Sequence, residues 1–405
     1  MADALKARDG KDVEDAVRWA VAEGKTLELA GRGSKRGLGR PSQSDLTLEL
    51  AGLSGVTLYE PEELVLSAKA GTPIAEIEAL VEQRGQQLAF EPMDYGPMFG
   101  GPAAAGSLGG VLAANLSGPR RIKAGAARDH FLGFSAVSGR AETFKSGGRV
   151  VKNVTGYDLC KLLAGSYGTL AAMTEVTIKT LPAPETEATV LVLGLDDARA
   201  IAAMSDAMGS SCDVSAAAHL PRNVVMHFPG IYVDQAATAF RLEGFAPSVK
   251  HRTQALVTML RPHGATETIN AGESKRLWRG VRDGAPFVSH GAAGEWPLWR
   301  VSTTPSRGAD FAQKLPPGAQ SYFDWAGGLI WVALPPSANA GAATIRRAAA
   351  LAGGHATLIR APAATRASVD VFEPQPGPLG AVTRRVKESF DPKGVLNPGR
   401  MWAGV

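Results

Sequence analysis

A short basic stretch, AGRGSKRGLG at residues 30–39, has the composition of a phosphate-binding loop. Its glycines allow successive backbone N–H groups to turn toward an anion. Ser34 adds a hydroxyl donor, and Arg32, Lys35 and Arg36 supply positive charge. A solvated glycine-rich loop with scattered charges has a similar composition, so this stretch alone leaves both interpretations open.

The stretch matches neither of the two common nucleotide-binding motifs. A triphosphate-binding P-loop requires G-x-x-x-x-G-K-[ST], whereas serine precedes lysine in Gly33-Ser34-Lys35. A dinucleotide fingerprint requires G-x-G-x-x-G, and here the position of the third glycine is Arg36. The loop therefore fails both standard tests, although its composition still suits phosphate.

Two further glycine-rich segments favour a ligand. Residues 106–118 read GSLGGVLAANLSG, in which small residues permit close approach to the backbone and Asn115 and Ser117 offer hydrogen bonds. A third cluster comprises Gly156 and residues 165–168. Three such clusters predict one long ligand held by backbone loops. The basic run PRRIK at 119–123 and Arg128 could face phosphate, an acidic partner or solvent.

The periodicity of apolar residues around these loops predicts alternating helices and strands. Expected helices are 12–23, 157–164 and 72–85, the last capped by Thr72, with Pro73 at its first position and Gly85 at its end. Expected strands are 26–30, 46–50, 56–59, 62–71, 170–182 and 131–139, the last entering a hairpin with residues 142–152.

Glycine density falls after Pro184, which indicates a second α+β domain. Its expected strands are 187–195, 224–228, 297–303, 321–334 and 355–361, and its expected helices are 198–208, 235–243, 273–282 and 340–352. Four tryptophans of this domain could face a cofactor or a partner, or could pack in its core: Trp296, Trp299, Trp325 and Trp331. Arg300 could bind a carboxylate or an acidic group of a partner, or could form a surface ion pair. A last helix at 379–389 leads to the tail FDPKGVLNPGRM.

Bulk properties narrow the class of protein. A chain of 405 residues suggests two or three domains. Cys160 and Cys212 are the only cysteines, too few for an iron–sulfur cluster. A net charge of +4 is weak support for nucleic-acid binding. No apolar run approaches the roughly 20 residues of a membrane-spanning helix, and the charged N-terminus is unlike a signal peptide, so we expect a cytoplasmic protein.

Four segments in order resemble the FAD-binding proteins of the vanillyl-alcohol-oxidase type, whose flavin domain is called PCMH-type. They are GRGSKRGLG, GSLGGVLAANLSGPRR with ARDHFLGFSAV, KNVTGYDLCKLLAGSYGTLAAMTEVTIKTLP, and FDPKGVLNPGRM. Within that family the chain looks most like the FAD-binding subunits of bacterial glycolate oxidases. The resemblance implies an α+β fold with an FAD-binding domain at 1–185, an α+β cap domain at 186–370, and a C-terminal segment at 371–405 that packs back on the FAD domain.

The resemblance also implies roles for particular residues. It places the flavin pyrophosphate on Arg32, Gly33, Ser34, Lys35, Arg36 and Gly37. It places the flavin ring and ribityl chain along Gly106, Ser107, Gly109, Gly110, Asn115, Ser117 and Gly118, followed by Arg128. The strand carrying Val176 and Ile178 would meet the adenine end, and Asn397 would lie near the flavin. Some relatives attach FAD covalently through a histidine in the first loop; residues 1–129 contain none, so we expect non-covalent FAD.

The chain departs from the catalytic members of that family. Its seven histidines form no H-x-H or H-x-x-x-H pair, and none lies in residues 373–405, so we expect no metal site and identify no catalytic residue. This favours an accessory subunit that works with a catalytic flavoprotein subunit and an iron–sulfur subunit, with a small 2-hydroxy acid such as glycolate as the substrate of the complex. A self-sufficient FAD-dependent dehydrogenase and an assembly scaffold with structural or absent FAD remain alternatives. Membrane association through partners also stays open.

Overall fold

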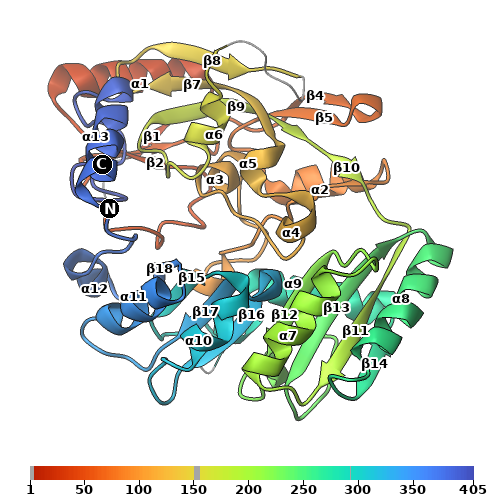
Figure 1. Cartoon of the computed structure of the whole chain (residues 1–405). Helices are drawn as coiled ribbons and strands as arrows, with labels where there is room; N and C mark the ends of the chain where they lie inside the picture. Colours follow the sequence, from red (N-terminus) through yellow and green to blue (C-terminus); the bar gives the residue numbers. More distant parts are fainter. Residues whose placement is uncertain (1–3, 150–155, 292) are drawn as a thin grey trace. The chain divides into compact units, whose positions relative to one another are not determined.

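The computed structural model describes residues 4–149, 156–291 and 293–405. The chain divides into two compact units, which are described separately (Figure 1). Unit 1 comprises Met1–Leu116, Gly125–Ala183 and Asp370–Val405, and unit 2 comprises Ser117–Ala124 and Pro184–Val369. The eight-residue segment Ser117–Ala124, expected in the first domain, thus groups with the second unit. Residues 152–155 of the motif KNVTGYDL, and the end of the expected 142–152 strand, lie outside the described residues.

A small parallel sheet and one helix form the N-terminal part of unit 1. Helix α1 (Gly10–Glu23) begins after Asp9, whose side chain accepts the Asp12 N–H, and ends at Gly24 in the left-handed conformation. Its buried residues, Val13, Val17 and Ala20, pack with leucines of the sheet. The strands are β1 (Ala4–Lys6), β3 (Leu46–Glu49) and β2 (Leu27–Ala30), in that order across the sheet. The sheet places the basic loop directly after β2.

An antiparallel five-stranded sheet forms the second part of unit 1. Its order is β4 (Val56–Glu60), β5 (Val65–Lys69), β9 (Ala171–Lys179), β7 (Phe131–Ser138) and β8 (Thr143–Gly147). The predicted 131–139 hairpin is confirmed as β7 and β8. The expected strand 170–182 is β9 followed by β10 (Leu181–Pro182), which pairs with β6 (Gln86–Gln87).

Short helices connect the strands of unit 1. They are α2 (Ile74–Glu82), α3 (Leu108–Ala113), α5 (Ala127–His130) and α6 (Leu159–Leu163), whereas the longer α13 (Gly377–Phe390) follows all the strands of this unit in the chain. The expected capping of α2 is wrong in detail, because Pro73 precedes the first helical residue and makes no side-chain cap. The Thr72 hydroxyl instead donates to the Lys69 carbonyl at 2.6 Å and accepts from the Gly55 N–H at 3.0 Å.

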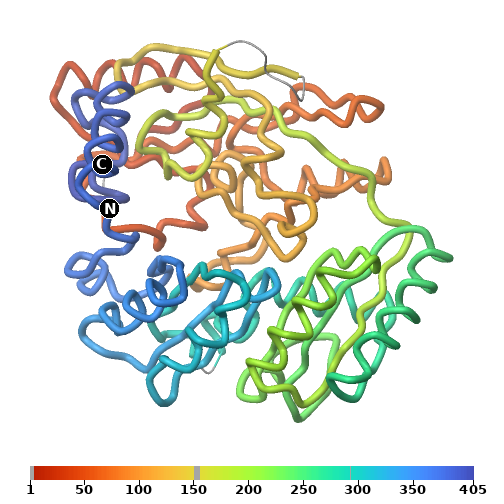
Figure 2. Tube along the Cα trace, in the orientation of Figure 1, coloured from red at the N-terminus to blue at the C-terminus, as the bar shows by residue number. Residues whose placement is uncertain are grey.

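The C-terminal segment returns to the start of the chain within unit 1. Figure 2 traces it in blue to the red N-terminal strands. Leu396 forms a parallel bridge with Leu27, and the Leu27 N–H donates to the Val395 carbonyl at 2.8 Å. Leu396 and Val395 also join the buried cluster beneath α1. The tail therefore continues the edge of the small parallel sheet, beside the basic loop.

Unit 2 contains an eight-stranded sheet in which every described pairing is antiparallel. Its order is β14 (Thr266–Ile269), β11 (Thr186–Leu193), β13 (Ala237–Gly244), β12 (Ala216–Leu220), β16 (Gln320–Asp324), β17 (Leu329–Ala333), β15 (Leu298–Ser302) and β18 (His355–Arg360). Its helices are α4 (Arg121–Ala124), α7 (Asp197–Met208), α8 (Ala246–Leu260), α9 (Ala271–Asp283), α10 (Gly308–Ala312), α11 (Ala342–Leu351) and α12 (Ala363–Ser368).

Two expected elements of unit 2 are of the wrong type, and the expected strand 321–334 is two strands, β16 and β17, separated by the 3-10 helix Trp325–Gly327. Residues 235–243 form strand β13 rather than a helix, and residues 224–228 contain the short 3-10 helix Val225–His227 rather than a strand. Strand β13 lies between β11 and β12 and is mostly buried. Its sequence, ATAFRLEG, contains alanine, leucine, arginine and glutamate, whose high helix propensity favours the wrong element. Its partner β12 was missed because alanine, which forms most of it, is uncommon in strands.

The tryptophans of unit 2 lie at different depths. Trp299 and Trp331 are fully buried in the sheet, which favours packing over contact with a cofactor or partner for these two residues. Trp325 is also nearly buried, and the guanidinium carbons of Arg121 and Arg300 stack on its ring at 4.3 and 4.9 Å from the centroid. The Trp325 indole N–H donates to the Gly118 carbonyl, which fixes the segment Ser117–Ala124 to unit 2.

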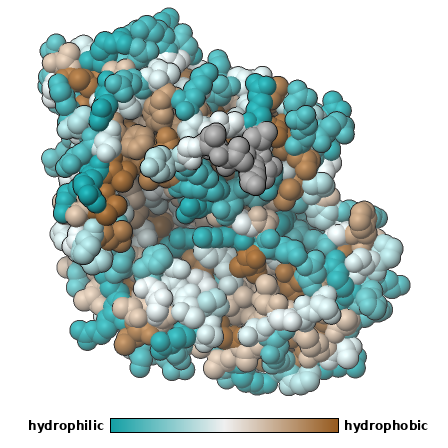
Figure 3. Space-filling view, turned by 45° about the horizontal axis from the view of Figure 1, so that its top comes forward, coloured by the Kyte–Doolittle hydropathy of each residue, from teal (hydrophilic) through white to brown (hydrophobic). Residues whose placement is uncertain are grey.

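The described surface carries mixed side chains. On the face shown in Figure 3, hydrophilic side chains predominate and apolar ones appear in several patches. None of the helices in the described ranges combines the length and the apolar character needed to cross a bilayer.

Candidate functional site

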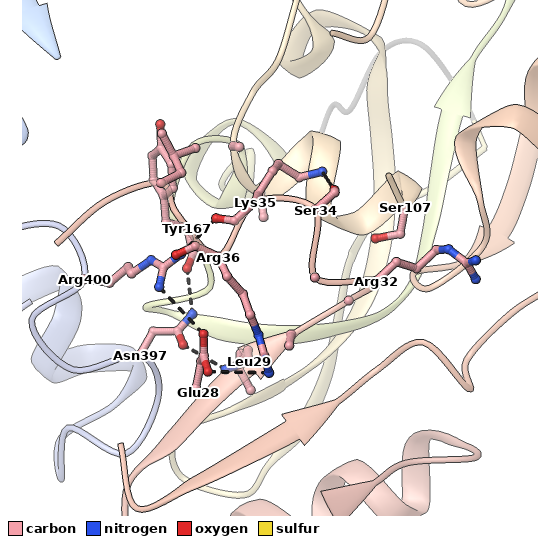
Figure 4. Close-up of a pocket in the computed structure, with 17 residues that line it drawn as sticks. Glu28, Leu29, Arg32, Ser34, Lys35, Arg36, Ser107, Tyr167, Asn397 and Arg400 are labelled. Carbon is pink, nitrogen blue, oxygen red and sulfur yellow. Dashed lines mark hydrogen bonds and ion pairs between the residues drawn. The ribbon is translucent and has the colours of Figure 1, made fainter. Parts of the chain in front are cut away.

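Two adjoining cavities in unit 1 form the candidate site, which we call the trough; Figure 4 shows the first of them. They share lining residues from all the glycine-rich segments and from the tail: Leu29, Gly31, Ser107, Gly110, Ala113, Tyr167 and Asn397. The first cavity adds the basic loop, with Arg32, Gly33, Ser34, Lys35 and Arg36. The second adds apolar groups, with Leu50, Ala70, Ala171, Ala172 and Met173.

The basic loop leaves β2 and folds by two tight turns. The Arg36 N–H donates to the Gly33 carbonyl at 3.3 Å, and the Leu38 N–H donates to the Lys35 carbonyl at 3.0 Å. Gly33 has a φ of 77°, which side-chain-bearing residues rarely adopt. These turns bring the side chains of Ser34 and Lys35 to the trough, where the Lys35 ammonium donates to the Ser34 hydroxyl at 3.0 Å.

The positive charges of the loop have different partners. The Arg36 guanidinium lies 3.6 Å from the Glu28 carboxylate and 3.4 Å from the Thr47 hydroxyl. Within the described ranges, Lys35 has no carboxylate at ion-pair distance, and Asp94 acts on it only through its longer-range charge. Burial of the ammonium lowers the pKa of Lys35 to about 8. Lys35 is therefore a loop cation that is withdrawn from solvent without a paired carboxylate among the described residues, as expected of a group that meets an anion.

Close packing across the trough requires glycine at several positions. A Cβ atom on Gly31 would lie 2.6 Å from the Ser107 hydroxyl, and one on Gly110 would lie 3.1 Å from both that hydroxyl and the Lys35 side chain. A Cβ on Gly109 would lie 2.8 Å from the Ala70 carbonyl. The first and second glycine-rich segments therefore lie against each other, with no room for side chains between them.

Asn397 joins the tail to both walls of the trough. Its side-chain oxygen accepts the Leu29 N–H at 2.8 Å, and its side-chain nitrogen donates to the Tyr167 carbonyl at 2.8 Å. Gly168, next to Tyr167, has a φ of 73°, and a Cβ there would lie 2.7 Å from the Asn397 amide nitrogen. The Asn397 side chain thus spans β2 and the loop before β9, as Figure 4 shows.

Arg400 of the same tail supports the basic loop. Its guanidinium donates to the carbonyls of Lys35 and Arg36 at 3.1 and 3.2 Å, and it lies 3.8 Å from the Glu28 carboxylate. Because these bonds hold two loop carbonyls on the side of the tail, they restrict the orientation of the intervening peptide groups. Arg400 and Tyr167 were missed by sequence reasoning, although both lie within motifs quoted above, NPGRM and GSYG.

The trough fits the diphosphate-containing cofactor that the sequence predicts. Lys35, the Ser34 hydroxyl and the turned backbone of the loop offer donors and positive charge to phosphate oxygens. The second cavity is lined mainly by aliphatic groups, which suit a flat uncharged ring. The lining residues of both cavities include no histidine or cysteine that could attach a flavin covalently.

The structure gathers nine of the predicted binding residues on the trough. They are Arg32, Gly33, Ser34, Lys35, Arg36, Ser107, Gly109, Gly110 and Asn397. Gly37 instead packs against Phe99, and Gly106 lies beside the Lys35 ammonium, where a Cβ would be 3.5 Å away. Neither of these glycines lines the two cavities.

The remaining predicted residues lie outside the lining of these cavities. Val176 and Ile178 are fully buried in the C-terminal half of β9, so their side chains are core groups, and the strand lines the trough at Ala171–Met173. Asn115 accepts the Arg128 N–H at 3.0 Å and so braces a loop, while Arg128 is exposed. Ser117 and Gly118 belong to unit 2.

Groups for acid–base or metal chemistry are sparse. In residues 4–149, 156–291 and 293–405, no cluster of three or more histidine, cysteine, aspartate or glutamate side chains has an arrangement that could hold a metal ion. His130 is buried with its Nδ1 3.3 Å from the Lys179 carbonyl. His219 is buried between the Thr238 hydroxyl and Asp197. Both histidines therefore have structural partners inside the protein.

Known proteins resemble the chain along most of its length. Residues 4–147 match a family model described as an FAD binding domain, and residues 375–401 match the C-terminal domain of FAD linked oxidases. The glycolate oxidase subunit GlcE of Escherichia coli is 34% identical over 390 residues, which cover 96% of each chain. The glycolate oxidase subunit GlcD of Bacillus subtilis is 31% identical over 153 residues, which cover 38% of this chain and 31% of that protein.

The fold has a counterpart among solved structures. A p-cresol methylhydroxylase structure superposes with a TM-score of 0.67 over 98% of this chain and 88% of that one, at 14% sequence identity. This likeness, with the matched FAD binding domain, confirms the predicted α+β fold class of PCMH type.

Proposed function

This chain belongs to the family of FAD-linked oxidoreductases that contains the glycolate oxidase subunit GlcE, and we propose that it is the non-covalent FAD-binding subunit of a glycolate oxidase-like complex. The observation that carries this proposal is the trough. There the backbone turns of the basic loop and the Lys35 ammonium, which has no ion-pair partner among the described residues, meet an apolar cavity, and the loop lies in the part of the chain that matches FAD binding domains.

The residues of the trough have distinct roles in this proposal. Lys35, Ser34 and the loop backbone hold the diphosphate, and Arg400 keeps the loop carbonyls turned toward the tail. Ala171–Met173, with Leu50 and Ala70, form the apolar wall that excludes water from an uncharged ring. FAD, when bound, supplies the electron-accepting chemistry that these side chains lack.

The lack of evident catalytic groups supports an accessory role. The described residues show no metal cluster, and the trough is lined by no histidine. We therefore propose that a catalytic flavoprotein partner oxidises the 2-hydroxy acid, glycolate to glyoxylate, and that electrons pass between flavins to an iron–sulfur partner. A subunit of this kind binds and tunes its flavin, and the partner holds the substrate base.

Spectroscopy of the purified chain tests this function. The chain alone should show a flavin spectrum, and acid denaturation should release all the flavin into the supernatant. Glycolate should bleach that spectrum only after the catalytic partner is added. A colourless chain that takes up no FAD would contradict the proposal, and bleaching of the chain alone would instead identify a self-sufficient dehydrogenase.

A further inference from the structure

Helix α13 carries one buried residue, and that residue is a lysine. Of its fourteen residues, all of them described, Lys387 alone is buried, with 4% of its surface exposed. Burying an ammonium group is costly unless every donor is used and an opposite charge lies beside it. The surroundings of Lys387 therefore show what this helix is built to hold.

Lys387 uses all three of its N–H donors within unit 1. They go to the Thr169 carbonyl at 2.6 Å, the Asp391 carboxylate at 2.7 Å and the Leu396 carbonyl at 2.9 Å. Asp391 is itself buried, and it accepts the backbone N–H groups of Val395 and Leu396 at 2.9 and 2.8 Å. One buried ion pair thus connects α13 with the tail that follows it and with Thr169, which is 218 positions away in the chain.

Both segments supply residues to the trough. Thr169 directly follows Tyr167 and Gly168, and Leu396 directly precedes Asn397. The Asn397 amide donates to the Tyr167 carbonyl, so Lys387 bonds carbonyls one residue before Asn397 and two residues after Tyr167, next to a contact that closes the trough wall. Neither Lys387 nor Asp391 lines the two cavities, so both act through other residues.

The turn after β7 also accommodates this pair. A Cβ atom on Gly139 would collide with the Asp391 carboxylate. Gly139 has no positive φ, so its backbone would tolerate alanine and only the approach of Asp391 requires glycine. The backbone of unit 1 is therefore shaped around the carboxylate of the pair, as expected when its position matters.

We propose that Lys387 and Asp391 are positioning residues for the cofactor, because together they set Asn397 and Gly168 in the register that completes the trough. This inference rests on the proposed FAD-binding function. A purely structural anchor would lower the stability of unit 1 when removed and leave FAD affinity of the folded protein unchanged. A positioning pair changes FAD affinity in protein that is still folded.

The test compares FAD binding and hydrogen exchange across four variants. Lys387→Met keeps the aliphatic stem and removes the donors, Lys387→Arg keeps the charge in a planar shape, and Asp391→Asn keeps the shape and removes the charge. Val81→Ala, in the buried face of α2, is the matched core control. We expect Lys387→Met to raise the FAD dissociation constant about tenfold or more, with partial rescue in Lys387→Arg, and no change in Val81→Ala.

Hydrogen exchange reports positioning without cofactor. Lys387→Met and Asp391→Asn should speed exchange of the Leu29 amide, which donates to Asn397, whereas Val81→Ala should not. If Lys387→Met does not fold, Asp391→Asn carries both measurements. Wild-type affinity and exchange in the folded variants would overturn this inference while leaving the proposed function intact. A wild-type chain that takes up no FAD, with exchange altered only in the variants, would overturn the function and keep the positioning of Asn397.

Discussion

The side-chain oxygen of Asn397 accepts a hydrogen bond from the Leu29 backbone N–H at 2.8 Å, across 368 positions of the chain. Leu29 lies on β2, immediately before the basic loop, and Asn397 lies in the C-terminal tail. The Asn397 side chain also reaches the Tyr167 carbonyl. The two ends of the chain are therefore both needed for a complete trough, and the tail is part of the site.

Substitutions at Asn397 separate its hydrogen bonds from its backbone conformation. Asn397 has a φ of 43°, which glycine adopts freely and alanine adopts with strain. Asn397→Gly should lose the two side-chain bonds, lower the free energy of unfolding by about 1–3 kcal/mol and reduce FAD content. Asn397→Ala should cost about 1 kcal/mol more. Denaturant unfolding measures the loss of stability, and flavin quantification measures the loss of FAD. Equal stability of the two variants would contradict the backbone strain expected in Asn397→Ala.

The pH dependence of FAD affinity should follow Lys35. Burial lowers the pKa of free Lys35 to about 8, and a bound phosphate would raise it again because it stabilises the charged form. Above about pH 8, FAD binding must then be coupled to protonation of Lys35. FAD affinity should therefore fall as pH rises above the pKa of Lys35 in the free protein and toward its pKa in the complex. Fluorescence titration across pH measures this fall.

Two variants control for other titrating groups. Lys35→Met should bind FAD more weakly at neutral pH and lose this part of the pH dependence, whereas Lys35→Arg should keep its charge throughout. A fall in affinity that persists unchanged in Lys35→Met would assign it to another group. The stability of the FAD-free protein should change with pH in the opposite direction. Charged Lys35 opposes folding below about pH 8, and this cost disappears as pH rises toward 10.5, the ordinary pKa of lysine.

The basic loop should be sensitive to backbone shape at Gly33 and to charge at Ser34. A Cβ on Gly33 would meet nothing within 4 Å, so only its φ of 77° disfavours other residues. Gly33→Val should therefore lower FAD occupancy, and Gly33→Asn, which tolerates this conformation better, should retain more of it. Ser34→Glu should lower occupancy by repelling phosphate, with Ser34→Ala as the milder control. The ratio of flavin to protein absorbance measures FAD occupancy. Full occupancy in both Gly33→Val and Ser34→Glu would show that the loop does not bind the cofactor.

Local composition and long-range packing explain which features the sequence could predict. The basic loop was predictable because its glycines and cations are adjacent in sequence and five of its predicted residues, 32–36, line the trough. Tyr167 and Arg400 carry no such local signal, since their roles depend on which distant carbonyl or loop lies beside them. The role of Val176 and Ile178 stays a prediction, because a motif locates a strand but does not say which part of it meets a ligand, and the cavity is lined by Ala171–Met173 of that strand.

The fold shows the same limit. Residues 235–243 were expected to be helical because QAATAFRLE is rich in residues of high helix propensity, whereas its pairing with β11 and β12 makes most of it a strand. Lys387 gave no sequence signal of burial, since lysine on an amphipathic helix normally faces solvent. Asp391 follows α13 directly and lies four residues from Lys387, but the Leu396 and Thr169 carbonyls come from the tail and the loop before β9, which the tertiary structure brings to it.

The contact between Gly31 and Ser107 provides a last test, by a double-mutant cycle. A Cβ on Gly31 would lie 2.6 Å from the Ser107 hydroxyl and 3.6 Å from its Cβ, so the hydroxyl alone makes the position too tight. Gly31→Ala should separate the two glycine-rich segments and reduce FAD affinity about tenfold or more. Adding Ser107→Ala removes the colliding oxygen and should restore part of that loss, although Ser107→Ala alone removes a donor. Additive effects of the two substitutions on FAD affinity would show that the segments do not meet at this contact.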